Sequence, residues 1–160
     1  MRRKDREVSD IEEKLRILGN SKVCRLGMAE NNQPYVIPLN FGYEYQDDVL
    51  TLYFHGAREG KKIDILKQNS RVCFEVDGGH ELIEGKEAWS YSFAYESLIG
   101  FGNAEFLENG EEKTHGLNLL MKHQTGKDTE YTFDERQLNA VAIFRVRAES
   151  FTGKRHTMPV

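Results

Sequence analysis

The stretch YVIPLNFGYEY, residues 35–45, has the most regular pattern in the chain. Every second residue is apolar or aromatic, which is typical of a strand with one buried face. These alternate positions are Tyr35, Ile37, Leu39, Phe41, Tyr43 and Tyr45. Pro38 cannot donate a hydrogen bond to a neighbouring strand, so the pattern predicts a free edge or a break there. Something other than a neighbouring strand is expected on that side.

Further strands are predicted on both sides of this stretch, and a few helices lie between them. The predicted strands are 22–29, 49–55 (a hairpin with the strand before it), 71–77, a long segment at 89–107 and 139–148. The predicted helices cover about 9–18, with Ser9 and Glu12 as a capping box, then 60–69 and 111–124. Residues 78–80 are expected to turn, and about 149–160 to form a C-terminal tail. About six strands with peripheral helices predict a mainly β protein, a small β-barrel.

The bulk properties restrict the class of protein. A length of 160 residues predicts a single domain, residues 1–160. The net charge of -4 argues against a nucleic-acid binder, and no apolar run approaches the roughly 20 residues that span a bilayer. Cys24 and Cys73 lie in apolar, strand-like runs, which predicts buried free thiols. We therefore expect a cytoplasmic protein without nucleic-acid or membrane partners.

Two common kinds of catalytic site have no support in the sequence. The five histidines show no zinc-binding spacing, so no metal site is expected. No G-x-S-x-G motif is present, and neither cysteine has a recognisable activating neighbour. A covalent hydrolase is therefore not indicated.

A strand-to-helix turn in YFHGAREGKKIDIL, residues 53–66, concentrates positive charge. The turn carries Gly56 and Gly60 together with Arg58, Lys61 and Lys62. A helix start offers unpaired N–H groups and the positive end of the helix dipole, which favour an anion. The motif is neither a P-loop nor a Rossmann fingerprint. On these residues alone, a phosphate site and a solvated helix start both remain open.

The neighbouring strand bears on this choice. Pro38, Asn40 and Gly42 give one face of the 35–45 strand small or mixed residues, next to the hairpin that leads into the turn. Such a face could form a floor for a flat ring, with backbone groups free to bond its edges. The alternative is a face covered by protein, for example at a dimer interface.

The segments YVIPLNFGYEY, LYFHGAREGKKIDIL, VCFEVD and YESLIGFGNAEFLE together resemble the flavin-binding split-barrel superfamily related to pyridoxamine 5′-phosphate oxidase. Within it the chain most resembles the branch of 5-nitroimidazole-resistance (Nim-type) proteins, which the opening MRRKDREV and the closing FTGKRH also fit. The resemblance covers nearly the whole chain. Its specificity lies in the order and spacing of the pieces.

The resemblance implies a six-stranded split β-barrel that forms a homodimer with FMN in two clefts at the interface. The strand along the isoalloxazine ring would comprise Val36, Ile37, Pro38, Leu39 and Asn40. The ribityl phosphate would be held by His55, Gly56, Ala57, Arg58, Lys61 and Lys62. A later strand, often from the partner chain, would complete the pocket with Trp89, Tyr95, Ser97 and Ile99. Arg155 and His156 would reach the pocket from the C-terminus.

Several of these residues could have a purely structural role instead. Arg58 could pair with Glu59, and His55, the candidate residue nearest the flavin chemistry, could simply end a strand. Trp89 could pack in a core or an interface, and aromatic residues at period two, as at Tyr91 and Tyr95, are more often core.

The implied function is a flavin-dependent oxidoreductase with a reduced nicotinamide as donor and a small nitroaromatic or related molecule as substrate. The tail lacks the tryptophan and the Arg-x-His arrangement of true pyridoxamine-phosphate oxidases, and only Lys154, Arg155 and His156 stand near the end. Vitamin B6 oxidation is therefore the less favoured alternative. A non-catalytic module that binds FMN or haem is the other.

Overall fold

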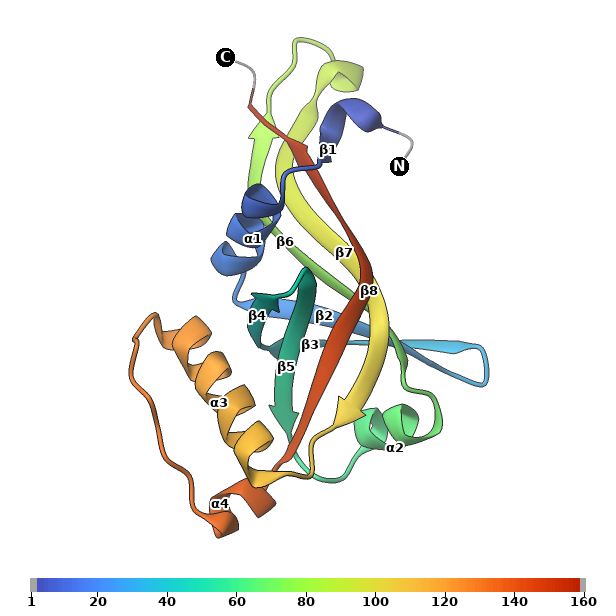
Figure 1. Cartoon of the computed structure of the whole chain (residues 1–160). Coiled ribbons are helices and arrows are strands. Elements are labelled where there is room, and N and C mark those ends of the chain that lie inside the picture. Colours follow the sequence, from blue (N-terminus) through green and yellow to red (C-terminus); the bar gives the residue numbers. More distant parts are fainter. Residues whose placement is uncertain (1–2, 159–160) are drawn as a thin grey trace.

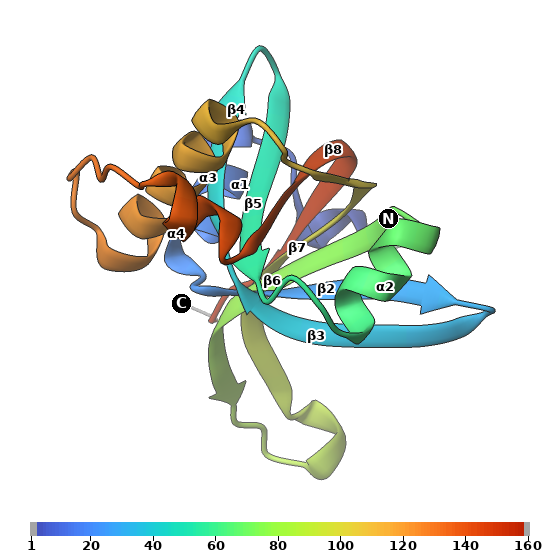
Figure 2. The same cartoon turned by 90° about the horizontal axis from the view of Figure 1, so that it is seen from below.

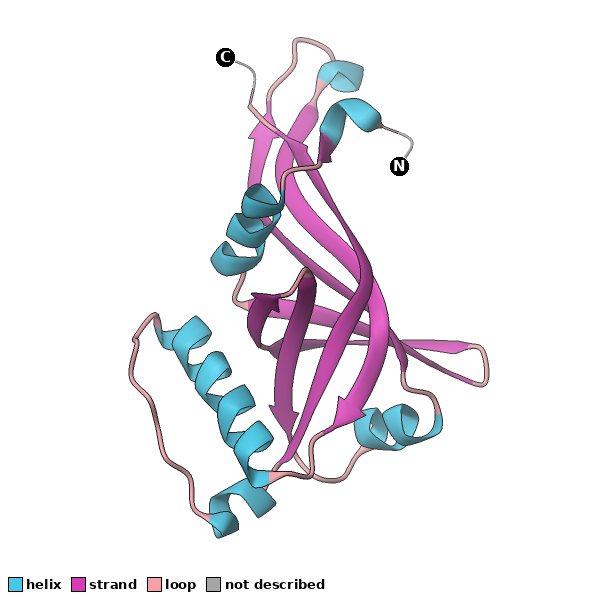
Figure 3. Ribbon diagram, in the orientation of Figure 1, coloured by secondary structure: helices cyan, strands magenta, loops and turns pink. Residues whose placement is uncertain are grey.

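The fold is an antiparallel sheet with helices along its margins, and the computed structural model describes residues 3–158 (Figures 1 and 3). The strands are β1 Glu7–Val8, β2 Val23–Glu30, β3 Gln33–Asn40, β4 Gly42–Gln46, β5 Val49–Gly56, β6 Arg71–Ile83, β7 Ser92–Phe106 and β8 Ala142–His156. The α-helices are α1 Ile11–Asn20, α2 Lys61–Gln68, α3 Gly110–Thr125 and α4 Glu135–Asn139. Two 3-10 turns cover η1 Lys4–Arg6 and η2 Ala88–Ser90.

The strands hydrogen-bond in the order β3-β2-β6-β7-β8-β5-β4, and β1 pairs with β8. The prediction of a mainly β protein of the split-barrel type is confirmed, although residues 3–158 form eight strands instead of six. The two edge strands, β3 and β4, are consecutive in the chain and are joined at Phe41, which is fully buried. The sheet thus stays open between its two edges.

The predicted continuous strand at 35–45 is wrong in one respect, because it breaks at Phe41 into β3 and β4. Its alternation is confirmed: Tyr35, Ile37 and Leu39 pack against the core, whereas Val36 is 60% exposed. The free edge expected from Pro38 is also confirmed, since β3 pairs only with β2.

Helix α1 covers the inner face of β6 and β7 and completes the core there (Figure 1). Ile17 and Leu18 are its buried residues. The predicted cap at Ser9 is wrong by one residue, because the side chain of Asp10 accepts the hydrogen bond from Glu13 N at 2.9 Å. The helix begins after Asp10 and continues to Asn20, two residues past the predicted end at about residue 18.

Strand β7 has several large apolar side chains on the outer face of the sheet, although Leu98 lies in the core. Phe93, Ile99 and Phe101 are 46%, 43% and 46% exposed, while the positions between them face the core. At Gly100 the inner face has no room for a side chain, because a Cβ there would overlap the ring of Phe74. The expectation that aromatic residues at period two belong to the core is therefore wrong on this strand.

Two predicted boundaries also need correction. Residues 78–80 do not form a turn; β6 runs on to Ile83, and a bulge between Gly78 and Glu81 absorbs the irregularity. Residues 149–156 are not a tail but the second half of β8, which pairs with β7 as far as Tyr95↔His156. Residues 159–160 of the predicted tail lie outside the described residues.

Both cysteines are free thiols, as predicted. Cys24 is fully buried, but Cys73 is only partly buried, because it lies on the outer face of β6. Within residues 3–158, no helix has the length and apolar character needed to cross a membrane.

Gly42 lies where α3 packs onto β4, and a larger residue has no room there. A Cβ at this position would overlap the backbone nitrogen of Leu120. Because the obstacle is backbone, Gly42→Ala must push the helix away, and we expect a loss of about 1–3 kcal/mol in the free energy of unfolding. Gly110→Ala is the matched control, since its Cβ would meet nothing nearer than Leu138 at 3.8 Å. Urea unfolding of both variants checks this, and equal stabilities would contradict it.

His123 on α3 links pH to stability. Its Nε2 lies 2.7 Å from the carbonyl oxygen of Ser21, and its ring lies 4.6 Å from that of Phe41. Burial lowers the pKa of His123, which favours a neutral ring that donates through Nε2. As the pH falls, His123 in the unfolded chain takes up a proton before His123 in the folded chain does. The stabilising contribution of the neutral ring is therefore fully present above about pH 6.5 and is lost as the pH falls below it.

We therefore expect the free energy of unfolding to fall more steeply from pH 7 to pH 5 in the wild type than in His123→Gln. The difference in slope cannot exceed one proton, about 1.4 kcal/mol per pH unit. Urea unfolding at several pH values measures it. Identical slopes would show that His123 titrates alike in both states.

Candidate functional site

The gap between the two sheet edges leaves parts of β3 and β5 without a strand partner on one side within residues 3–158. Strand β4 pairs with β5 only as far as Gly42↔Tyr53, so residues 54–56 of β5 extend beyond it. On its other side β3 has no strand partner within residues 3–158, yet it contacts β5. Backbone N–H and C=O groups at this edge are therefore free to bond a ligand, as is usual for an unpaired strand.

The turn after β5 leads into an uncapped helix start. Gly60, with φ 123°, adopts a backbone conformation that glycine tolerates best, and no side chain caps α2. The carbonyl oxygen of Gly60 accepts from the N–H groups of Ile63 and Asp64 at 2.8 and 3.1 Å. The earliest N–H groups of the helix face no competing side-chain acceptor, which suits an anion.

Lys62 places its ammonium group against the last residue of β5. A Cβ at Gly56 would overlap Lys62 Nζ, so the group occupies room that only glycine leaves. Burial lowers the pKa of Lys62, and burial followed by the charge of Lys62 lowers the pKa of His55. No ion pair to Lys62 is found in the described part of the chain. The turn thus holds a partly buried cation with no protein counter-ion.

Lys61 connects the turn with the edge strand β3 through a contact with Tyr35. Its Nζ lies 4.7 Å from the centre of the Tyr35 ring, a cation–π contact. Figure 2 shows α2 beside β2 and β3 in the same region. The strand and the turn to which the resemblance assigns the ring and the phosphate therefore lie side by side.

The structure does not place every predicted residue at this site. Arg58 turns away: its Nη1 donates to the carbonyl oxygen of Asn139 at 3.0 Å, and no ion pair with Glu59 forms within residues 3–158. Asn40 donates through Nδ2 to Lys22 O and Gln124 Oε1 at 3.1 and 3.0 Å, so its side chain fastens β3 to α3. Ile37 and Leu39 face the core, whereas Val36, Pro38 and Ala57 are exposed.

Trp89, Tyr95, Ser97 and Ile99 lie on η2 and on the outer face of β7. Trp89 is 86% exposed, so the core alternative for it is wrong. The β6–β7 hairpin that carries Trp89 projects away from α2 in both Figure 1 and Figure 2. One protomer therefore does not bring Trp89 to the turn.

The end of β8 lies beside Tyr95. Lys154 Nζ is 5.6 Å from the Tyr95 ring, and the His156 ring lies 6.5 Å from it. Arg155 points to the other face, where it pairs with Glu13 and, at 3.5 Å, with Glu96. Of the predicted C-terminal pair, only His156 accompanies Tyr95.

Sequence reasoning missed a polar group in the middle of the outer face. Arg25 Nη1 lies 3.0 Å from Glu75 Oε2 and also pairs with Asp77, and His80 Nε2 lies 2.9 Å from Asp77 Oδ2. Burial, followed by the charge of Asp77, raises the pKa of Glu75. The sequence contains charged residues at alternate positions of two predicted strands. They indicate a polar cluster only once β2 and β6 are known to pair, which places Arg25 opposite Glu75.

The family model described as pyridoxamine 5′-phosphate oxidase matches residues 10–155. A crystal structure of a candidate 5-nitroimidazole antibiotic resistance protein from Bacteroides thetaiotaomicron shares 33% identity over 93% of this chain and 86% of that one, with a TM-score of 0.80. An FAD-binding protein from Mesorhizobium loti shares 26% identity over 95% and 98%, with a TM-score of 0.65. The flavocytochrome Anf3 from Azotobacter vinelandii, 20% identical over 99% and 73%, has a TM-score of 0.82. No protein of curated function matches significantly.

An open split barrel with a cationic turn at the gap in its sheet defines the class of this protein. The chain belongs to the pyridoxamine 5′-phosphate oxidase family, and within it to the branch that resembles 5-nitroimidazole-resistance proteins. The family and branch expected from the sequence are thus confirmed.

Proposed function

We propose that the chain is an FMN-binding flavoprotein that acts as an oxidoreductase on a small nitroaromatic or related substrate. The observation that carries this proposal is Lys62, a partly buried cation with no protein counter-ion, set against Gly56 beside an uncapped helix start. These groups fit a terminal phosphate, and the free edge of β3 fits the polar edge of a flat ring. The 33% identical resistance protein and the FAD-binding relative support the same conclusion.

Each residue of the site has a role in this proposal. Lys62 and Lys61, with the first N–H groups of α2, would bind the ribityl phosphate, and Gly56 would let it approach the backbone. Residues 36–40 would lie along the isoalloxazine ring through their backbone. His55, held neutral by its lowered pKa, would orient the phosphate or the flavin edge. FMN would supply two-electron transfer between a reduced nicotinamide and the acceptor.

Proton delivery needs no dedicated side chain in this arrangement. Although partial burial of its ring lowers the pKa of His55, the residue as a whole is exposed, so solvent can reach it. Arg155 is paired with Glu13 and Glu96, so it is not available to bind a vitamin substrate. This favours a reductase of small aromatic molecules over a pyridoxamine-phosphate oxidase.

The outer face of the sheet supports a homodimer with FMN at its interface. Val36, Gly27, Cys73 and Phe101 form one cross-strand row from β3 to β7. Val36 and Phe101 are large and exposed, and the residues between them are small. Exposed apolar patches of this kind mark interaction surfaces.

A second copy on this face would complete each pocket. The partner subunit's Trp89, Tyr95, Ser97 and Ile99 would close over the ring, since the hairpin that carries Trp89 projects away from the turn of its own protomer. Trp89, the chain's only tryptophan, is 86% exposed in the protomer and would be buried in such an interface.

Rapid-mixing absorption measurements test the catalytic part of the proposal. We expect NADH or NADPH to bleach the bound flavin and a 5-nitroimidazole to restore its colour. A flavin that no nicotinamide reduces would indicate a non-catalytic binding module. A Soret band in the purified protein would indicate haem instead.

A further inference from the structure

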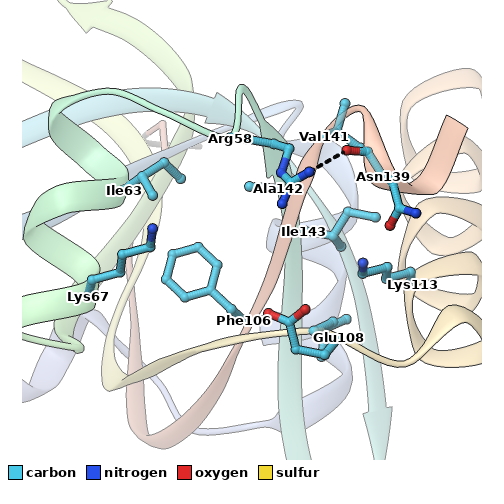
Figure 4. A pocket seen from close by; sticks show the side chains of 11 residues that line it. Arg58, Ile63, Lys67, Phe106, Glu108, Lys113, Asn139, Val141, Ala142 and Ile143 are labelled. Atoms are coloured by element: carbon cyan, nitrogen blue, oxygen red, sulfur yellow. Dashed lines mark hydrogen bonds between the residues drawn. The ribbon is translucent and has the colours of Figure 1, made fainter. Parts of the chain in front are cut away.

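A separate cavity of about 160 Å³ lies between α2, the first turn of α3 and the start of β8 (Figure 4). None of His55, Gly56, Lys61 and Lys62 lines it. Apolar walls and cationic groups share its lining, chiefly Arg58, Ile63, Lys67, Phe106, Lys113 and Ile143. Its composition therefore calls for an explanation independent of the flavin site.

Lys113 is the unusual member of this lining. It is only 8% exposed, and its side chain has no hydrogen bond or ion pair within residues 3–158. In Figure 4 its ammonium group points into the cavity. The Nζ atom itself is not fully buried, so the ammonium group meets the solvent of the cavity at the end of a largely buried side chain. Holding a cation there without a partner is costly, since such charges in proteins are normally paired.

The location of Lys113 increases this cost. Helix α3 begins at Gly110, so Lys113 lies in its first turn, where the helix dipole is positive and a cation is unfavourable. The carboxylates of Glu111 and Glu112 follow the start of the helix, but Glu112 pairs with Arg145 at 2.9 Å. Neither of these carboxylates, nor any other within residues 3–158, forms an ion pair with Lys113.

Two more cations surround the same space. Arg58 uses one N–H on the carbonyl oxygen of Asn139, which leaves its other donors available, and Lys67 approaches from α2 (Figure 4). Glu108 is the only carboxylate among the lining residues. Arg58 and Lys67 are exposed, whereas Ile63 is buried, so these cations act between solvent and an apolar wall.

We propose that this cavity binds a small oxyanion, namely a phosphate group, with Lys113, Arg58 and Lys67 as its cations. The group would come from free phosphate or from a small phosphate monoester. A volume of about 160 Å³ is too small for a nucleotide, since ligand pockets for larger molecules begin at about 300 Å³. The proposal does not depend on flavin binding, because the two sites share no residue other than Arg58, which faces this cavity.

Calorimetric titration tests the site on the full chain, with FMN added in excess so that the turn is occupied. Inorganic phosphate and glycerol 3-phosphate are titrated separately. We expect Lys113→Met to weaken binding of the preferred anion by about tenfold or more, the loss of one charge-assisted hydrogen bond. Lys127→Met, an exposed control on the loop after α3, should bind as the wild type does.

Two further variants keep the test decisive. Glu108→Gln removes the only opposing carboxylate and should tighten binding several-fold, a gain that misfolding cannot produce. Lys113→Met should also melt at a higher temperature than the wild type in phosphate-free buffer, because it removes an unpaired cation from the first turn of α3. Binding that is absent in the wild type, unchanged in Lys113→Met, or abolished by Lys62→Met in its place would overturn the proposal.

Discussion

Lys62→Glu is expected to lose FMN almost completely. The substitution replaces the partly buried cation beside Gly56 by a carboxylate that repels the phosphate at the start of α2. Loss of a charge-assisted hydrogen bond and the added repulsion together should weaken FMN binding by at least about a hundredfold. Fluorescence titration of FMN with the apoprotein measures this directly.

A matched charge reversal separates this effect from net charge. Lys127→Glu makes the same change at an exposed lysine distant in sequence from the turn and should bind FMN normally. Lys62→Glu should also keep the oligomeric state of the wild type, because Lys62 does not lie on the outer face of β7. Equal FMN affinity in both variants would refute the phosphate assignment.

Phe101→Asp is expected to convert a dimer into monomers. Phe101 lies in the exposed row that ends at Val36, and an aspartate there would have to be buried without a partner in a dimer. The monomer would also lose FMN, since the residues proposed to close the pocket come from the other subunit. Light scattering coupled to size-exclusion chromatography measures the mass, and absorbance measures the flavin.

Val49→Asp provides the control for this prediction. Val49 is 40% exposed, comparable with 46% for Phe101, but it lies at the β4–β5 hairpin. It should leave both mass and flavin content unchanged. A Phe101→Asp protein that remains dimeric with full flavin content would show that the interface lies elsewhere.

The alternation in residues 35–45 was enough to predict β3 and its inward face. It could not predict the break at Phe41, because the apolar period continues through it and the sheet edge is set by how β4 pairs with β5. The sequence likewise indicated the cationic turn and the helix after it. The contact of Lys62 with Gly56 could not be predicted, because it depends on the side-chain conformation of a residue six positions along the chain.

Strand β7 shows where alternation alone is insufficient. Both of its faces are compatible with burial, since Phe93 and Phe101 alternate with small residues that also fit a core. Phe74 and Phe151 fill the space inside Gly100, so the neighbouring aromatic side chain of Phe101 lies on the outer face. The position of Arg58 was equally unpredictable, because its partner is the carbonyl group of Asn139, far along the chain.

The absorption spectrum of the purified protein, with identification of the released cofactor, tests the central claim most directly. We predict the bands of oxidised flavin and release of FMN in an amount equimolar with the chain. A colourless protein that takes up no added FMN would contradict the account.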